Sequence, residues 1–204
     1  MIESIFCGPP AHGRIANWLG PQMVQRLLHF AQAQRDSFRA SGVSNHNADK
    51  KVVDLTVRQS HKIKLQGQLR DELQAGARAA LPQMCRQLGS GRFEPSAFEI
   101  EMVAHGDGAF FAEHCDRYAD TRSHRRLISA VYYFHRLPKS FSGGVLRLYP
   151  LAGGDNSKTF VEIEPVNDTL VFFPSWFPHE VLPVSCPSGR FEDSRFAINC
   201  WIHS

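Results

Sequence analysis

The sequence predicts an α+β protein that is mainly β, with a jelly roll of antiparallel strands backed by a layer of N-terminal helices. Apolar residues recur at three- and four-residue steps in the first part of the chain. After Gly91, short alternating segments are separated by turn-forming clusters such as Gly153-Gly154-Asp155-Asn156. Because helical segments come first and no repeat or linker interrupts the chain, we expect one domain over residues 1–204. Residues 1–92 would form helical support and a lid region, and residues 93–204 the jelly-roll core.

Length and composition exclude several classes of protein. With 204 residues, of which 43% are hydrophobic and 21% charged, the chain has the composition of one soluble globular domain. The net charge of +3 comes from scattered basic residues, which predicts neither a nucleic-acid partner nor a membrane partner. The 5 cysteines show no paired metal spacing and the N-terminus has no signal-peptide pattern, so we expect free thiols and a cytoplasmic location.

The first helix is expected from Pro21 to near Ala40, after a short lead-in over residues 1–20. Met23, Leu27 and Phe30 lie at helical spacing, and proline suits the first turn of a helix. The polar segment 43–51 then predicts a surface loop. Alternating apolar residues over 52–57 predict a strand.

A second helix is expected over residues 66–88. One side of it carries Leu69, Leu73, Ala77 and Ala80. Pro82 lies inside this segment, and we expect it to kink the helix or to split it in two.

The rest of the chain reads as strands, because apolar and β-branched residues alternate in short runs between turn residues. These runs cover residues 98–102, 110–116, 126–135, 144–149, 159–164, 169–174, 179–184 and 195–202.

The tripeptide His114-Cys115-Asp116 is a candidate metal site. Residues two apart on a strand share a face, so one ion could bind the imidazole and the carboxylate while Cys115 points away. His179, in a segment rich in Phe and Trp, is the best candidate for a third ligand. Two histidines and one carboxylate are the facial set of non-haem Fe(II) oxygenases. The alternative is a histidine that is hydrogen-bonded to the nearby carboxylate in an ordinary strand.

Arg195 is a candidate anion-binding residue. On the strand S-R-F-A-I-N-C-W it shares a face with Ala197, Asn199 and Trp201, whereas Phe196, Ile198 and Cys200 share the other face. An arginine that faces the apolar interior of a barrel needs an anion. That anion is either a ligand carboxylate or the partner of an internal salt bridge.

Six ordered motifs between about residue 98 and residue 203 resemble the catalytic domain of 2-oxoglutarate/Fe(II)-dependent prolyl 4-hydroxylases, including the oxygen-sensing type. The motifs are H-C-D, A-V-Y-Y-F-H, S-G-G-V-L-R-L-Y-P, V-E-I-E-P-V-N-D-T-L-V-F-F, P-H-E-V-L-P-V and S-R-F-A-I-N-C-W. The resemblance implies a double-stranded β-helix, the cupin-like form of the jelly roll.

The resemblance also implies roles for individual residues. His114, Asp116 and His179 would be the iron ligands, and Arg195 would bind the distal carboxylate of 2-oxoglutarate. The remaining residues of that co-substrate pocket would be Tyr133, Asn199 and Trp201.

Two positions depart from the family pattern. His105 stands where the family often has tyrosine, and it either contacts co-substrate or substrate or is an ordinary loop residue. The insert 186–193 contains Arg190, a second arginine close in sequence to Arg195 that could bind the co-substrate carboxylate instead. The strand register nevertheless favours Arg195, because R-F-A-I-N-C-W reproduces the family strand.

The implied activity is a hydroxylation that uses Fe(II), 2-oxoglutarate and O2, with ascorbate as an accessory compound, and yields succinate and CO2. His114, Asp116, His179 and Arg195 would be its catalytic residues. The presence of Asp116 favours hydroxylation, because related halogenases lack that carboxylate. The expected substrate is a prolyl residue in a protein or peptide, covered by residues 43–53 as a lid. The alternative is that residues 43–53 form an ordinary solvated loop.

Three alternatives stay open. The first is a hydroxylase of a free amino acid or of a peptide natural product. The second is a non-catalytic binding module on the same fold. The third is a zinc-binding cupin, which would have no use for a clamp that binds 2-oxoglutarate.

Overall fold

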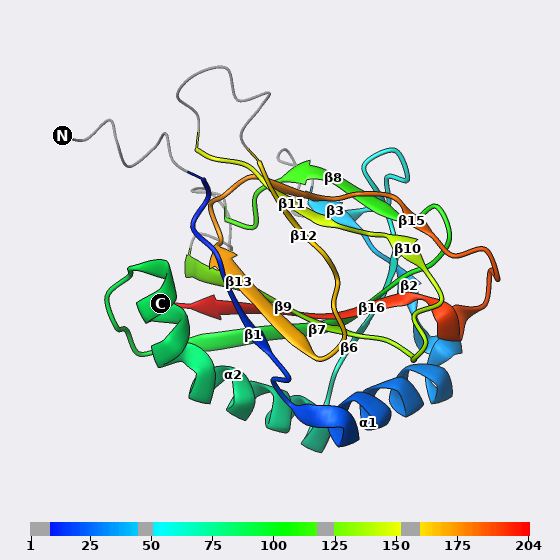
Figure 1. Cartoon of the computed structure of the whole chain (residues 1–204), viewed down its shortest axis with the longest axis horizontal. Helices are drawn as coiled ribbons and strands as arrows, with labels where there is room; N and C mark the ends of the chain where they lie inside the picture. The colour runs from blue at the N-terminus through cyan, green and yellow to red at the C-terminus, as the bar shows by residue number, and fades with distance from the viewer. Residues whose placement is uncertain (1–8, 45–50, 118–124, 152–159) are drawn as a thin grey trace.

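Two antiparallel sheets lie face to face, and two helices cover the outer face of the larger sheet (Figure 1). The computed structural model describes residues 9–44, 51–117, 125–151 and 160–204. The 7-stranded sheet has the order β1 (Gly13–Ala16), β13 (Thr169–Pro174), β9 (Arg126–Phe134), β16 (Arg195–His203), β7 (Ala97–His105), β6 (His61–Lys64) and β2 (Arg39–Ala40). The 5-stranded sheet has the order β12 (Val161–Ile163), β11 (Leu146–Leu148), β14 (His179–Val181), β8 (Phe110–His114) and β5 (Arg58–Gln59).

Two short strand pairs complete the β structure. They join β3 (Val43–Ser44) to β4 (Lys51–Val52) and β10 (Ser142–Gly143) to β15 (Val184–Ser185). The expected lid 43–53 therefore begins and ends in paired strands, whereas its residues 45–50 lie outside the described ranges. The predicted class, a mainly β jelly roll backed by N-terminal helices, is confirmed.

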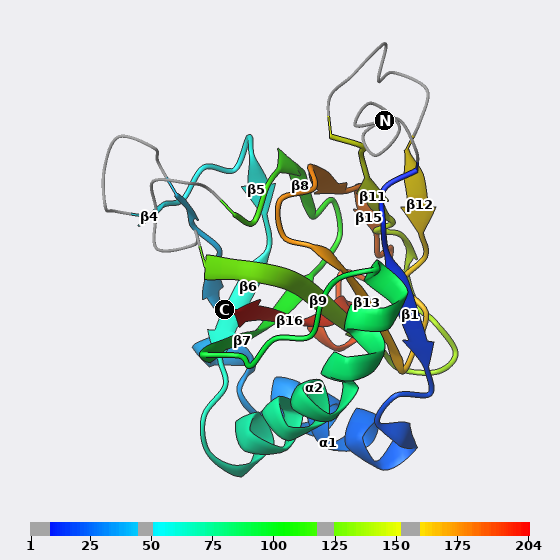
Figure 2. The same ribbon diagram turned by 90° about the vertical axis from the view of Figure 1, so that its left-hand side faces the viewer.

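The helices α1 (Gly20–Ala33) and α2 (Gly67–Leu88) lie side by side below the larger sheet in both views (Figures 1 and 2). The expectation that Pro82 would split α2 is wrong, because the helix runs through it to a left-handed cap at Gly89. Leu81, Met84 and Cys85 are buried around the proline. Their packing on the sheet offsets the one backbone hydrogen bond that proline cannot donate.

The predictions were less accurate between the helices. The first helix ends at Ala33 and not near Ala40, and a 3-10 turn, η2 (Arg35–Ser37), leads into β2. The predicted strand over 52–57 is mostly a turn. The Asp54 carboxylate accepts hydrogen bonds from the backbone N–H of Thr56 at 2.9 Å and from its hydroxyl at 2.6 Å. Such a side-chain turn competes with strand pairing.

The alternation of β16 divides the interior into two apolar clusters. Phe196, Ile198, Cys200 and Ile202 pack toward the helices, together with buried residues of α1 and α2. Ala197 faces the space between the sheets, where it belongs to a second cluster with Tyr133, Leu146, Leu148, Val171 and Phe173. The predicted faces of this strand are therefore confirmed.

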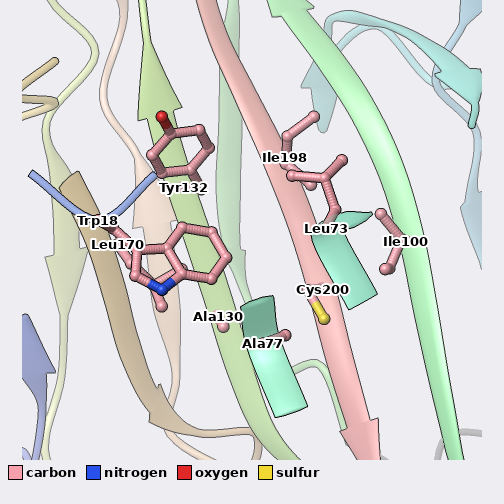
Figure 3. Close-up of a pocket in the computed structure, with 9 residues that line it drawn as sticks. All are labelled: Trp18, Leu73, Ala77, Ile100, Ala130, Tyr132, Leu170, Ile198 and Cys200. Carbon is pink, nitrogen blue, oxygen red and sulfur yellow. The ribbon is translucent and has the colours of Figure 1, made fainter. Parts of the chain in front are cut away.

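A small cavity lies between α2 and the larger sheet (Figure 3). Its volume is about 10 Å³, which is the space of a single water molecule. The side chains around it are Trp18, Leu73, Ala77, Ile100, Ala130, Tyr132, Leu170, Ile198 and Cys200. The cavity is too small for an organic ligand, so the helical layer supports the sheet by packing. Within the described ranges, neither helix is long and apolar enough to span a bilayer.

Candidate metal and co-substrate site

Two neighbouring strands of the smaller sheet bring the predicted metal ligands together. His114 ends β8, His179 begins β14, and the two residues are direct cross-strand partners. Asp116 follows β8 and lies 3.7 Å from His114 (Oδ1 to Nε2) and 3.5 Å from His179 (Oδ2 to Nε2). One ligand atom from each of the three residues lies within 4.8 Å of the others. This is the donor set and the facial arrangement that Fe(II) takes in non-haem oxygenases.

Backbone carbonyls orient both imidazole rings. Nδ1 of His114 lies 2.9 Å from the carbonyl oxygen of Ala112, and Nδ1 of His179 lies 2.9 Å from that of Phe177. A carbonyl only accepts, so each Nδ1 carries the proton and each Nε2 lone pair points toward Asp116. Burial, followed by the charge of His179, lowers the pKa of His114 to about 3. The His114 ring is therefore neutral at pH 7, the form that binds a metal.

Two serines hold the carboxylate in place. Ser129 donates a hydrogen bond of 2.7 Å to Oδ2 of Asp116 and lies 2.9 Å from the hydroxyl of Ser175. The Asp116 N–H donates to the carbonyl of Ser175 at 3.0 Å. Burial acts to raise the pKa of Asp116, but His179, His114 and the Ser129 hydrogen bond outweigh it and lower that pKa. The group is thus an anion that faces two lone pairs, and a cation between them would complete the site.

Arg195 begins β16 and is almost fully buried, with 2% of its surface exposed. Its Nε donates to the carbonyl of Gly144 at 2.7 Å, and its Nη1 lies 3.3 Å from Nδ1 of His105. Its guanidinium carbon lies 4.8 Å from the centre of the Tyr133 ring. In the part of the chain that is described, no carboxylate pairs with it. An internal salt bridge, the alternative raised from the sequence, is therefore not found there.

Two further polar groups lie beside Arg195 without a well-formed hydrogen bond to the described part of the chain. The Tyr133 hydroxyl and Nε2 of His105 are buried and make no hydrogen bond to any described residue. Cross-strand pairing sets His105 opposite Arg195 and Tyr133 opposite Ala197. A guanidinium and two orphaned polar groups around one space fit a carboxylate ligand.

His105 is a neutral donor at this position. Burial and the charges of Arg195 and Arg58 hold its pKa well below the ordinary value. Since its Nδ1 accepts from Arg195, the proton resides on Nε2, which is the unpartnered atom. The structure places His105 beside Arg195, at the end of β7 and not in a loop.

Glycine is required where the chain passes Arg195. Gly144 has φ +65°, and a Cβ atom there would lie 2.5 Å from Cδ of Arg195. Gly143 has φ +67°, and a Cβ atom there would lie 2.3 Å from the carbonyl oxygen of Pro183. The S-G-G motif thus lets the backbone approach the guanidinium closely.

The other candidates from the sequence lie in different places. Asn199 shares the interior face of β16 with Arg195, opposite Glu101 of β7. Trp201 lies six residues beyond Arg195, about 20 Å along the strand. There the guanidinium of Arg126 covers its ring at 4.2 Å and donates to the Asp116 carbonyl at 3.2 Å. The structure therefore places Trp201 near the metal ligands and not beside Arg195.

Arg190 points away from the interior. Its side chain is 60% exposed, and its Nη2 and Nε donate to Oδ2 of Asp193 at 2.7 and 2.9 Å. Of the two arginines, only Arg195 faces the interior, as its place in the strand register predicts. No pattern in the sequence marked Phe111, whose ring stacks on His114 at 3.5 Å, or Arg58, which lies over Phe111.

A jelly roll that places two histidines and one carboxylate between its sheets belongs to the class of non-haem iron folds. Residues 100–203 match the family model of the 2OG-Fe(II) oxygenase superfamily. The match covers half of the chain, and the chain belongs to this superfamily.

Individual relatives agree with that assignment. The chain is 35% identical to an uncharacterized PKHD-type hydroxylase of Synechocystis, over 98% of this chain and 65% of that protein. A crystal structure of a Pseudomonas putida prolyl-4-hydroxylase is 25% identical with a TM-score of 0.70, covering 96% of this chain and 94% of that one. A Trichoplax adhaerens prolyl hydroxylase, in complex with a hypoxia-inducible-factor peptide fragment, shares the fold. Its TM-score is 0.71 at 22% identity, over 95% of this chain and 83% of that one. The resemblance stated from the sequence motifs is confirmed.

Proposed function

We propose that this chain is a 2-oxoglutarate- and O2-dependent Fe(II) hydroxylase that acts on a prolyl residue in a protein or peptide. The observation that supports this most strongly is the pairing of two features on one interior. One is a convergent His-Asp-His cluster, and the other is a buried arginine that pairs with no carboxylate of the described residues. The proposal includes that residues 1–204 form one oxygenase domain. The chain spans 65% of the length of its Synechocystis relative, so a whole-protein activity is likewise a proposal.

In this proposal His114, Asp116 and His179 hold Fe(II), which supplies the O2 activation that couples hydroxylation to the conversion of 2-oxoglutarate into succinate and CO2. The other residues bind and orient. Arg195 donates to the distal carboxylate, and the Tyr133 hydroxyl and Nε2–H of His105 donate beside it. Burial of these donors keeps water away from the carboxylate and strengthens each bond.

Support for a prolyl substrate comes from the Pseudomonas putida enzyme, to which the chain is similar over nearly its full length. The second candidate, a free amino acid or peptide natural product, is favoured by charged side chains beside the metal ligands. Arg58 lies over Phe111, which stacks on His114, and Glu101 and Lys62 continue this charged group away from the ligands, where an apolar lining would suit a proline ring.

The test supplies Fe(II), 2-oxoglutarate and O2 with proline-containing peptides or free amino acids, and detects succinate and oxygen gain by mass spectrometry. We expect a peptide prolyl residue to gain one oxygen atom, and we expect Asp116→Ala to abolish the gain. Oxygen transfer to free amino acids alone would support the second candidate. A folded, iron-loaded protein that consumes no 2-oxoglutarate would contradict both candidates.

A further inference from the structure

A second buried arginine faces the same interior, and no role in binding iron or 2-oxoglutarate has been assigned to it. Arg58 begins β5, at the edge of the smaller sheet, and only 7% of its surface is exposed. Its guanidinium carbon lies 4.4 Å from the centre of the Phe111 ring, and that ring stacks on the iron-ligand candidate His114 at 3.5 Å. Arg58 is thus one aromatic ring away from the metal site.

The outer nitrogens of Arg58 donate no hydrogen bond to a described residue. Its Nε donates to the Ser60 hydroxyl at 2.9 Å, and that hydroxyl lies 2.9 Å from the hydroxyl of Ser41. Glu101 Oε1 is 4.0 Å from Nη2, which is too far for a hydrogen bond. In the described ranges, neither Nη1 nor Nη2 donates to any residue. A guanidinium presents five N–H donors, and only Nε–H of Arg58 has an acceptor among the described residues.

Glu101 contributes the matching acceptor. It lies on β7 two residues from Val103 and four from His105, so all three share the interior face. Lys62 donates to Oε2 of Glu101 at 2.6 Å, whereas Oε1 is buried and makes no hydrogen bond to a described residue. Two cations share this one carboxylate, and Asp116, whose charge also acts on Arg58, belongs to the candidate metal ligands. An anion bound to Arg58 would give the buried guanidinium a partner of its own.

We propose that Arg58 binds a carboxylate of the substrate, and that Oε1 of Glu101 accepts a hydrogen bond from an N–H group of the same molecule. The substrate class that fits is an amino acid, or a peptide that presents a free carboxylate next to the carbon to be hydroxylated. Arg195 would bind one carboxylate of 2-oxoglutarate, and Arg58 the carboxylate of the second reactant. This inference rests on the proposed iron and 2-oxoglutarate chemistry, and it narrows the substrate to the second candidate or to a peptide whose reacting residue carries a free carboxylate.

The test measures binding without turnover. The protein is loaded with Mn(II) and 2-oxoglutarate, and ligand-observed NMR relaxation reports which small molecules approach the metal. The probes are matched pairs that differ only in the carboxylate: L-proline and L-prolinamide, and a set of N-acetyl amino acids and their amides. We expect at least one acid to bind about tenfold or more tightly than its amide.

Variants separate Arg58 from the co-substrate site. Arg58→Met is expected to abolish the preference for the acid, and Arg58→Lys to keep part of it. Both variants should retain wild-type affinity for 2-oxoglutarate in the absence of any probe. Arg190→Met, which removes an exposed arginine, is the control and should behave as wild type.

Three results would overturn the inference. They are equal binding of every acid and amide in wild type, an acid preference that survives in Arg58→Met, and a loss of 2-oxoglutarate affinity in Arg58→Met as large as in Arg195→Met. The last result would assign Arg58 to the co-substrate. A wild-type protein that binds no metal or 2-oxoglutarate would instead refute the proposed function itself.

Discussion

Arg195, His105 and Gly144 form the part of the site where single residues matter most. The guanidinium is held by the Gly144 carbonyl at 2.7 Å and by Nδ1 of His105 at 3.3 Å. Both contacts direct the remaining donors toward the space beside the Tyr133 hydroxyl. The guanidinium is therefore held in place without a ligand, which would lower the entropy lost if it binds 2-oxoglutarate as proposed.

Replacing Gly144 by alanine tests this arrangement. The new Cβ atom would lie 2.5 Å from Cδ of Arg195, so the guanidinium must move. We expect Gly144→Ala to weaken 2-oxoglutarate binding about tenfold or more, because one charge-assisted hydrogen bond contributes about 1.5–3 kcal/mol. Gly189→Ala is the matched control. It has a similar φ of +62° but no atom within 4 Å, so it should cost stability without changing that affinity.

His105 predicts a pH dependence of stability. Burial first, and then the charges of Arg195 and Arg58, lower its pKa in the folded protein, so the unfolded chain binds a proton at a higher pH than the folded protein does. Its contribution to stability is present above the unfolded pKa of about 6.5 and is lost as the pH falls below it.

Thermal or urea unfolding of the metal-free protein between pH 7 and pH 5 would measure this effect. Wild type is expected to lose up to about 1.4 kcal/mol per pH unit more than His105→Gln does. Equal slopes for the two proteins would show that His105 is not held neutral.

The candidate metal ligands and Arg195 could be predicted from the sequence, whereas the residues that pack around them could not. His114, Asp116, His179 and Arg195 carry spacing and strand register that limit where they can point. Arg58 lies in a segment without periodicity, and only strand pairing with β8 brings it to Phe111. No local pattern marks such a residue.

Among the elements, α1 is joined to the barrel by a residue almost 150 positions away. Asp168, in the turn before β13, accepts hydrogen bonds from the N–H of Leu19 at 3.0 Å and of Gly20 at 3.0 Å. The Tyr132 hydroxyl donates to the same carboxylate at 2.8 Å. The side chain thus supplies the N-terminal cap that α1 lacks locally, and an anion there also suits the helix dipole.

Asp168→Ala should therefore destabilise the whole domain. It removes a helix cap and leaves buried donors unpaired, so we expect a loss of about 2–4 kcal/mol in the free energy of unfolding. Tyr132→Phe removes one hydroxyl from the same network and should cost about 1 kcal/mol. Chemical denaturation measures both values, and an Asp168→Ala protein as stable as Tyr132→Phe would rule out the capping role.

Element predictions succeeded where the periodicity was local. The strands from residue 97 onward and both helices have clear patterns. The strands β1 and β6 were missed because their strand conformation is stabilised by pairing with β13 and β7, which their own residues do not reveal. Pro82 misled the prediction because the tertiary packing of α2 outweighs one lost hydrogen bond.

At the scale of the whole molecule, metal binding and folding should be coupled. The three ligand candidates come from two strands of the smaller sheet and the segment after β8, so the site exists only in the folded protein. A ligand that binds only the folded state stabilises it by about 2.7 kcal/mol at a hundred times its dissociation constant.

We accordingly expect Mn(II) in that excess to raise the melting temperature by roughly 5–10 °C for a domain of this size. Addition of 2-oxoglutarate should raise it further only when metal is present. Differential scanning fluorimetry with Asp116→Ala as control measures this. A 2-oxoglutarate effect that is the same with and without metal would contradict the shared site.

The central claim, that one site binds Fe(II) through His114, Asp116 and His179 and 2-oxoglutarate through Arg195, is tested most directly by an anaerobic titration. 2-Oxoglutarate is added to the Fe(II)-loaded protein, and the visible charge-transfer band of the complex is recorded. Wild type and Arg190→Met should give the same band. Asp116→Ala should give none, and Arg195→Met should need roughly 10- to 150-fold more 2-oxoglutarate. A folded, iron-containing wild-type protein without the band would contradict the account and favour a non-catalytic binding module.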